Sequence, residues 1–181
     1  MNIINKIKGK VGSIVLERNL KSRKRPVIYN NFNSSSTIGF IFDAENKENY
    51  TAAKEFMNYV EERGIKVNGL AFVYKSDLIG YFPYKKGVDY FGLDKQNWYG
   101  KPIDDGIDEF IERPFDILID ISLSKIYPVE YIFALSKAKF KICNNSAKAQ
   151  YADFVLNLSR ADDLGLFIEQ IKHYLETIET K

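Results

Sequence analysis

Residues 115–122 read FDILIDIS, a nearly continuous apolar run with β-branched isoleucines at every second position from Ile117. A short run of this kind is typical of a strand that is buried on both faces of a parallel sheet. Pro114 ends any helix before the run, because proline lacks the N–H of a helical hydrogen bond. Asp120 and Ser122 come at its carboxyl end, where open α/β sheets bind ligands. The run therefore predicts both the centre of the fold and a candidate site.

Strand and helix patterns alternate on both sides of this run. Upstream, TIGFIFD at 37–43 and VNGLAFV at 67–73 read as buried strands around a helix that covers 49–63. The other predicted elements are a strand at 88–91, helices at 104–112 and 128–138, strands at 139–143 and 154–158, and a last helix that Asp162 or Asp163 caps and that runs to Ile178. This order predicts a single Rossmann-like α/β domain of three layers, with a mostly parallel sheet of about six strands in the order 3-2-1-4-5-6.

In that strand order the first and fourth strands are neighbours, so their carboxyl ends meet where the order reverses. Asp43 and Ala44 would then lie beside Ser122. Asp43 and Asp120 could form a carboxylate pair that binds Mg²⁺ or acts as acid and base. Alternatively, Asp43 caps the following helix, and Asp120 and Ser122 stabilise a turn.

The composition excludes several kinds of site. With 45% hydrophobic and 28% charged residues among 181, the chain can bury the core of one domain. Cys143 is the only cysteine and His173 the only histidine, which excludes an internal disulfide and a cysteine-rich zinc site and disfavours a Ser-His-Asp triad. No GxGxxG, P-loop or GxSxG motif occurs, so we predict no cofactor and no metal, and we disfavour an enzyme. The chain has no bilayer-spanning run and no secretory signal, which predicts a cytoplasmic protein.

Charge is unevenly distributed along the chain. Residues 1–26 carry eight Lys and Arg against one Glu, a formal charge of +7, so the net charge of +2 leaves −5 for the remaining residues. A basic segment of this kind can bind an anionic partner, which here could be RNA or a ribosome, a membrane surface or an acidic protein. The residues predicted to make this contact are Lys6, Lys8, Lys10, Arg18, Lys21, Arg23, Lys24 and Arg25.

The basic segment also has a helical pattern. Its apolar residues recur at spacings of three and four, which predicts a single apolar face. They are Ile4, Ile7, Val11, Ile14 and Val15. Two interpretations remain open: the helix lies on a partner, or it folds back on its own domain with KSRKRP as a solvated linker. In both, residues 1–36, which end in the polar linker NNFNSSS, precede a domain at 37–181.

The only tryptophan, Trp98, lies in the segment DKQNWYGKP at 94–102. With Tyr99 it could form an exposed aromatic patch for a partner, a sugar or a base. The interpretation that we favour is that Trp98 plugs the edge of the sheet as a core residue.

Several segments resemble an uncharacterised family of small bacterial α/β proteins, a domain of unknown function. The resemblance rests on the basic N-terminal segment and on IGFIFD, NWYGKP, PFDILIDIS and ALSKAKFK. It covers nearly the whole chain and implies no established activity. More weakly, 115–121 and 138–142 resemble the N-terminal half-domain of heptosyltransferase-type glycosyltransferases. Those enzymes bind the sugar nucleotide in a second domain, and this chain ends where that domain would begin. The weaker resemblance therefore implies an acceptor-side half-domain without independent glycosyl transfer.

Two hypotheses about function follow from these observations. The first, which we favour, is a non-catalytic binding or adaptor protein that docks through its basic N-terminal arm. The alternative is a protein or enzyme that binds a small ligand, a sugar or a nucleotide, in the crevice at the ends of the first and fourth strands. The residues assigned to that ligand site are Asp43, Ala44, Asp120, Ser122 and Trp98.

Overall fold

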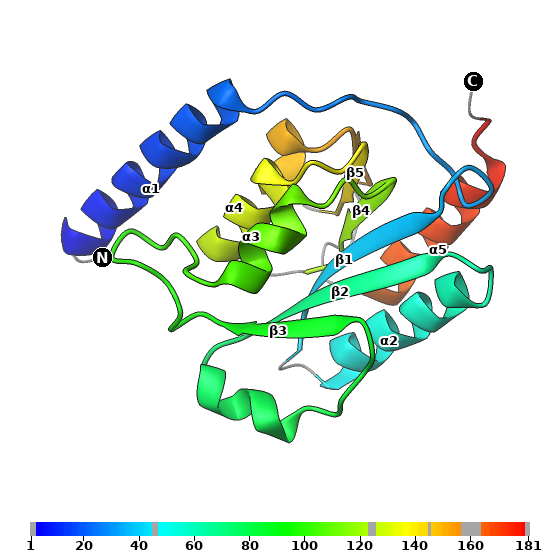
Figure 1. The fold of residues 1–181 in the computed structure, drawn as a ribbon, viewed down its shortest axis with the longest axis horizontal. Helices are drawn as coiled ribbons and strands as arrows, with labels where there is room; N and C mark the ends of the chain where they lie inside the picture. The colour runs from blue at the N-terminus through cyan, green and yellow to red at the C-terminus, as the bar shows by residue number, and fades with distance from the viewer. Residues whose placement is uncertain (1–2, 45–46, 123–125, 145, 157–163, 180–181) are drawn as a thin grey trace.

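Six parallel strands form the centre of the computed structural model, which describes residues 3–44, 47–122, 126–144, 146–156 and 164–179 (Figure 1). The strands are β1 (Thr37–Asp43), β2 (Lys66–Val73), β3 (Val88–Gly92), β4 (Ile117–Asp120), β5 (Phe140–Cys143) and β6 (Phe154–Val155). Their order across the sheet is β3-β2-β1-β4-β5-β6, and every pairing between them is parallel. The predicted Rossmann-like order is therefore confirmed, with β4 next to β1 at the centre.

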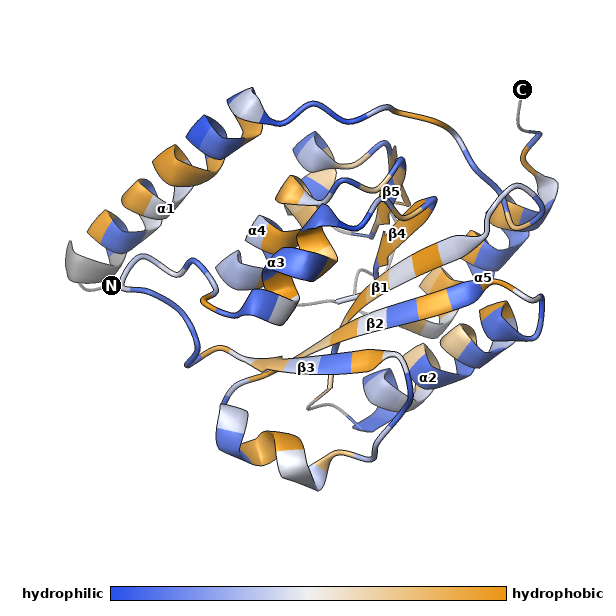
Figure 2. Ribbon diagram, viewed as in Figure 1, coloured by the Kyte–Doolittle hydropathy of each residue, from blue (hydrophilic) through white to orange (hydrophobic). Residues whose placement is uncertain are grey.

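Helices cover both faces of this sheet. They are α1 (Ile3–Ser22), α2 (Lys47–Glu61), α3 (Asp105–Glu112), α4 (Tyr127–Leu135) and α5 (Leu164–Thr177), with the short 3-10 helices η1 (Ser76–Tyr81) and η2 (Ser146–Tyr151). α2 and α5 pack on one face, and α3 and α4 pack on the other, so the domain has two hydrophobic cores (Figure 1). Hydrophobic residues dominate β4 and β5 (Figure 2), and all four residues of β4 are buried.

Two predicted strands extend beyond the observed ones. β4 covers only four residues of the 115–122 run. Phe115 and Ile121 are nevertheless buried in the core on either side of it, because apolar packing continues past the hydrogen-bonded ladder. β6 covers only two residues of the predicted 154–158 strand. Residues 157–158, together with the predicted caps Asp162 and Asp163, lie outside the described residues.

Residues 30–36, predicted as a polar linker, are packed against the domain. The Asn30 side chain donates to the Asp116 carbonyl oxygen at 3.1 Å, and the Asn31 side chain donates to the Ile178 carbonyl oxygen at 2.8 Å. Phe32 is buried, with its ring edge-on to Tyr59 at a centroid distance of 6.0 Å. The correction has a physical reason: asparagine amides can be buried where they satisfy backbone carbonyls that would otherwise lack a donor.

Candidate functional site

The predicted site residues at the switch point come from two neighbouring strands. Ile41 of β1 is in register with Asp120 of β4. Beyond the ladder, the Ala44 N–H donates to the Phe72 carbonyl oxygen at 3.1 Å, which keeps the end of β1 close to β2. Asp43 is half-buried, whereas Ala44 is buried. The carboxyl ends of β1 and β4 therefore lie side by side, as the strand order predicted.

Asp120 is fully buried and forms an ion pair with Lys148 of η2. Its second oxygen accepts hydrogen bonds from the Ser122 N–H at 2.9 Å and from the Ser122 hydroxyl at 2.6 Å. The Lys148 ammonium also donates to the Ser122 hydroxyl oxygen at 2.9 Å. Lys148 was not among the predicted site residues, because a lysine that follows a strand in the sequence is usually exposed.

A serine beside a lysine can form a nucleophile and its base, but only where the lysine is neutral and the serine donates to it. Here the Ser122 hydroxyl donates to Asp120, and Lys148 donates to the hydroxyl oxygen, so the proton arrangement is the reverse. All three groups are buried. The cluster therefore joins β4 to η2 as a satisfied polar network, and Asp120 could bind a metal or a ligand only by giving up Lys148.

A second buried lysine, which the sequence also did not reveal, lies in β5. The Lys141 ammonium donates to the Ala134 carbonyl oxygen at 2.8 Å and lies 5.6 Å from the centre of the Phe133 ring. Burial, reinforced by repulsion from the nearby Arg25, lowers the pKa of Lys141 to about 7. Arg25 itself forms two hydrogen bonds to the Asp153 carboxylate, at 2.6 and 2.8 Å.

The N-terminal helix folds back on its own domain and packs beside α4. The Tyr127 hydroxyl donates to the Gly12 carbonyl oxygen at 2.6 Å. A Cβ at Gly12 would lie only 3.0 Å from the Tyr127 ring, and a Cβ at Gly100, where φ is 97°, only 2.8 Å from it. Tyr127 is therefore held between two glycines, one in α1 and one in the loop before α3. Burial raises the pKa of Tyr127 above that of an exposed tyrosine.

Two of the arginines predicted to bind a partner make contacts with the domain. Arg23 donates to the Leu135 carbonyl oxygen at 3.0 Å and pairs with Glu112 at 2.5 Å. Arg25 pairs with Asp153. The interpretation of KSRKRP as a solvated linker is therefore wrong at these two positions. Each arginine donates to a backbone carbonyl at or just after the end of α4 and pairs with a carboxylate, which lies on α3 for Arg23 and just before β6 for Arg25.

The predicted apolar face of α1 is only partly buried: Val11 and Val15 are half-buried, but the side that packs most closely is a different one. Ile7 and Ile14 are 51% and 63% exposed, whereas Leu16 is 1% exposed and belongs to the core on the α3–α4 face. Asn19, which donates to the Tyr131 hydroxyl at 3.2 Å, lies on the packed side. The helix packs on this side because Gly12 has no side chain and lets Tyr127 approach closely. The spacing of apolar residues in the sequence does not reveal such a contact. The outward face combines exposed basic residues with the two isoleucines, and hydrophobic and hydrophilic positions alternate along the helix (Figure 2).

Trp98 is 59% exposed, so the interpretation of this residue as a core plug is wrong. The Asn97 side-chain oxygen accepts from the N–H groups of Tyr99 and Lys101 at 3.2 and 2.9 Å, and this tight turn directs Trp98 outward. Trp98, Tyr99 and Lys8 line a shallow cavity of about 300 Å³ between the loop and α1. The basic helix and the aromatic residues, which were predicted separately, therefore both line this cavity.

The docking of α1 predicts opposite effects for the same substitution at two of its glycines. Gly9→Ala should raise the free energy of unfolding by about 0.5–1 kcal/mol, since alanine favours helix and no atom lies near its Cβ. Gly12→Ala should lower it by about 1–2 kcal/mol, because the added Cβ crowds Tyr127. Urea unfolding gives both values, and trypsin should cut α1 faster in the Gly12 variant. Equal effects of the two changes would show that α1 does not pack through Gly12.

Fold and site together define a Rossmann-like α/β protein with a basic N-terminal helix docked on its own domain. The chain belongs to a family of unknown function, DUF6913, whose model matches residues 8–178. No curated protein matches it. The family resemblance drawn from the sequence is consistent with this match, whereas the heptosyltransferase likeness and the bacterial origin stay predictions.

Proposed function

We propose that this protein is a non-catalytic binding protein that docks on an acidic membrane surface through the outward face of α1. The observation that supports this proposal is the composition of that face once the other side of the helix is packed. The exposed side chains on it are Lys6, Ile7, Lys10, Ile14, Glu17, Arg18 and Lys21. Spacings of three, four and seven place Ile7, Lys10 and Ile14 on one line, with Arg18 and Lys21 continuing it. Among the described residues no helix is long and apolar enough to cross a bilayer.

Both parts of this face suit a lipid headgroup layer. Each Lys or Arg near an acidic leaflet contributes about 1 kcal/mol, and one acidic residue, Glu17, offsets part of this. Ile7 and Ile14 can add apolar burial at the acyl boundary, as in interfacial helices. Gly9 and Gly12 would weaken an isolated helix, but docking on the domain holds α1 helical before any lipid is bound.

An RNA partner would use a different part of the same surface. Trp98 could stack on a base and Lys8 could contact a phosphate. In such a complex the apolar side chains of Ile7 and Ile14, in the middle of the exposed face, would contribute no contact to the RNA. We therefore favour the membrane surface, and RNA is one outcome of the test. The small-ligand hypothesis at the switch point is less favoured, because Asp120 and Ser122 are already bound to each other and to Lys148.

Charge reversal on the outward face should strongly weaken vesicle binding. The full-length protein is sedimented with vesicles of phosphatidylserine and phosphatidylcholine in equal parts, and with phosphatidylcholine alone. Lys10→Glu/Arg18→Glu should raise the half-saturating lipid concentration about thirtyfold or more, since each reversal replaces an attraction by a repulsion. Ile14→Ser should raise it about fivefold. The matched control is Lys66→Glu/Lys86→Glu, two exposed lysines of β2 and the following crossover, which should bind nearly as the wild type does.

Three results would count against the membrane proposal. The first is no binding to acidic vesicles, and the second is equal binding to both vesicle types. The third is binding to single-stranded polyuridylate, with no vesicle binding, that Lys10→Glu/Arg18→Glu removes; that result would assign the face to RNA.

A further inference from the structure

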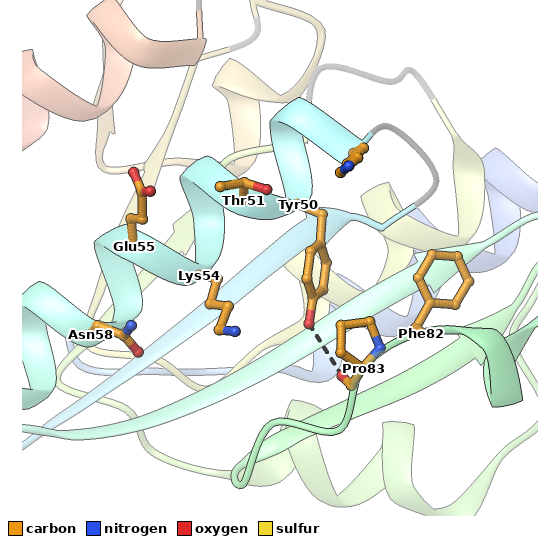
Figure 3. Close-up of a pocket in the computed structure, with 8 residues that line it drawn as sticks. Tyr50, Thr51, Lys54, Glu55, Asn58, Phe82 and Pro83 are labelled. Carbon is orange, nitrogen blue, oxygen red and sulfur yellow. Dashed lines mark hydrogen bonds between the residues drawn. The ribbon is translucent and has the colours of Figure 1, made fainter.

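A cavity of about 520 Å³ lies between α2 and the extended residues that follow η1 (Figure 3). Its volume is within the roughly 300–1,000 Å³ that ligand sites commonly have. Tyr50 and Phe82, which line it, contact the core under α2 and α5, whereas α1 packs on the opposite face. The cavity is therefore separate from the surface proposed to bind membranes.

One wall of the cavity is aromatic and rigid. The hydroxyl groups of Tyr50 and Tyr90 both donate to the Pro83 carbonyl oxygen, at 3.2 and 3.1 Å. The Phe82 ring stacks on Tyr90 with centroids 5.7 Å apart and lies 6.5 Å from the Tyr50 ring. Burial raises the pKa of Tyr90, so its hydroxyl stays a donor at neutral pH. A ring surface fixed in this way is preorganised to take a flat ligand.

The other wall is one face of α2 and carries free positive charge. Lys47, Tyr50, Thr51 and Lys54 follow the helical spacing of i, i+3, i+4 and i+7. Within the described part of the chain, neither Lys47 nor Lys54 has an ion pair or a hydrogen bond, whereas Lys85 nearby is paired with Glu61. Figure 3 shows Lys54 extending toward the Pro83 segment beside Tyr50. Glu55 also lines the cavity, but among the described residues its carboxylate forms no ion pair with Lys54.

We propose that this cavity binds a small planar anion, an aromatic ring that carries a phosphate or carboxylate group. The ring lies against Phe82 and Tyr50, and the anionic group is held by Lys54 and Lys47. The aromatic wall and the two lysines contact different parts of the same ligand, so both contribute to its affinity. A ring without charge leaves the ammonium groups unused, and an anion without a ring leaves the aromatic wall uncovered.

The test is calorimetric titration of the full-length protein with AMP, UMP and 2-aminobenzoate, three planar anions of different size. Adenosine and inorganic phosphate serve as the matched fragments, one without the anion and one without the ring. At least one planar anion should bind with a Kd below about 1 mM, and its fragments at least about tenfold more weakly.

Variants locate the binding site. Lys54→Met should weaken the bound anion about tenfold or more, because it removes a charged hydrogen-bond donor. Phe82→Leu, which keeps an apolar side chain but loses the ring, should weaken it about fivefold or more. Lys66→Met, which removes an exposed lysine at the start of β2, should leave the affinity unchanged. Lys10→Glu/Arg18→Glu should also leave it unchanged, which separates this proposal from membrane binding.

The proposal is overturned by any of three results: none of the three planar anions binds in the millimolar range, the fragments bind as tightly as the whole ligand, or the ligand that binds is unaffected by both Lys54→Met and Phe82→Leu.

Discussion

Replacing Lys148 by methionine is expected to lower the free energy of unfolding by about 3–5 kcal/mol. The substitution leaves the Asp120 carboxylate at the centre of the sheet, fully buried and without its counter-ion. It also removes the donor to the Ser122 hydroxyl oxygen. Chemical denaturation with urea measures the loss. Lys137→Met provides the matched control: that lysine is half-exposed and pairs with Glu112 at the surface, so its removal should cost about 0.5 kcal/mol or less.

The companion change tests the reason for this loss. Asp120→Asn removes the charge but keeps an oxygen that can accept from Ser122. In the Asp120→Asn/Lys148→Met double variant no uncompensated charge is buried, so at least half of the stability lost in Lys148→Met should return. A double variant as unstable as the single one would show that Lys148 acts through packing and that the ion pair matters little.

Replacing Lys141 by methionine is expected to stabilise the protein by roughly 2–4 kcal/mol at neutral pH. Burial lowers the pKa of Lys141 from 10.5 to about 7, so between these values the unfolded chain holds a proton that the folded protein lacks. Stability of the wild type should therefore rise with pH across this window, by about 1.4 kcal/mol per pH unit from this residue. Methionine has a similar length and no charge, and the lost hydrogen bond to Ala134 offsets part of the gain.

Urea unfolding of both proteins at several pH values between neutral and strongly alkaline checks this prediction. The difference in stability should be largest near pH 7 and should fall to zero or below near the ordinary pKa of lysine, where only the lost hydrogen bond to Ala134 remains. Parallel profiles at all pH values would mean that Lys141 is not held in a charge-disfavouring site, whatever the absolute effect of the substitution.

The strand order could be predicted because each strand and helix can be recognised from a short stretch of sequence, and their alternation then indicates the topology. Alternating isoleucines at Ile117, Ile119 and Ile121 indicate a strand covered on both faces, and the intervening helical patterns leave a parallel sheet as the consistent arrangement. The position of Asp43 and Asp120 at adjacent strand ends then follows from topology alone.

The candidate sites could not be predicted to the same extent, because they depend on contacts between distant residues. Lysine is usually a surface residue, so nothing in the sequence marks Lys148 or Lys141 as buried. Only the folded chain shows that Lys148 donates to a carboxylate 28 residues away and that Lys141 donates to a carbonyl at the end of a helix. Similarly, no local pattern distinguishes Gly12, which meets Tyr127, from Gly9, which meets nothing. Trp98 faces outward because of the turn at Asn97, whereas the general tendency of tryptophan to be buried predicts the opposite.

The placement of Tyr127 also determines when α1 can dock. Tyr127 and Tyr131, which contact Gly12 and Asn19, follow them by 115 and 112 residues, and Asp153 follows Arg25 by 128. At typical rates of protein synthesis, an interval of this length takes on the order of ten seconds. The helix α1 is therefore synthesised long before the residues on which it packs. During that interval α1, which Gly9 and Gly12 weaken as a helix, has no surface of its own domain to pack on.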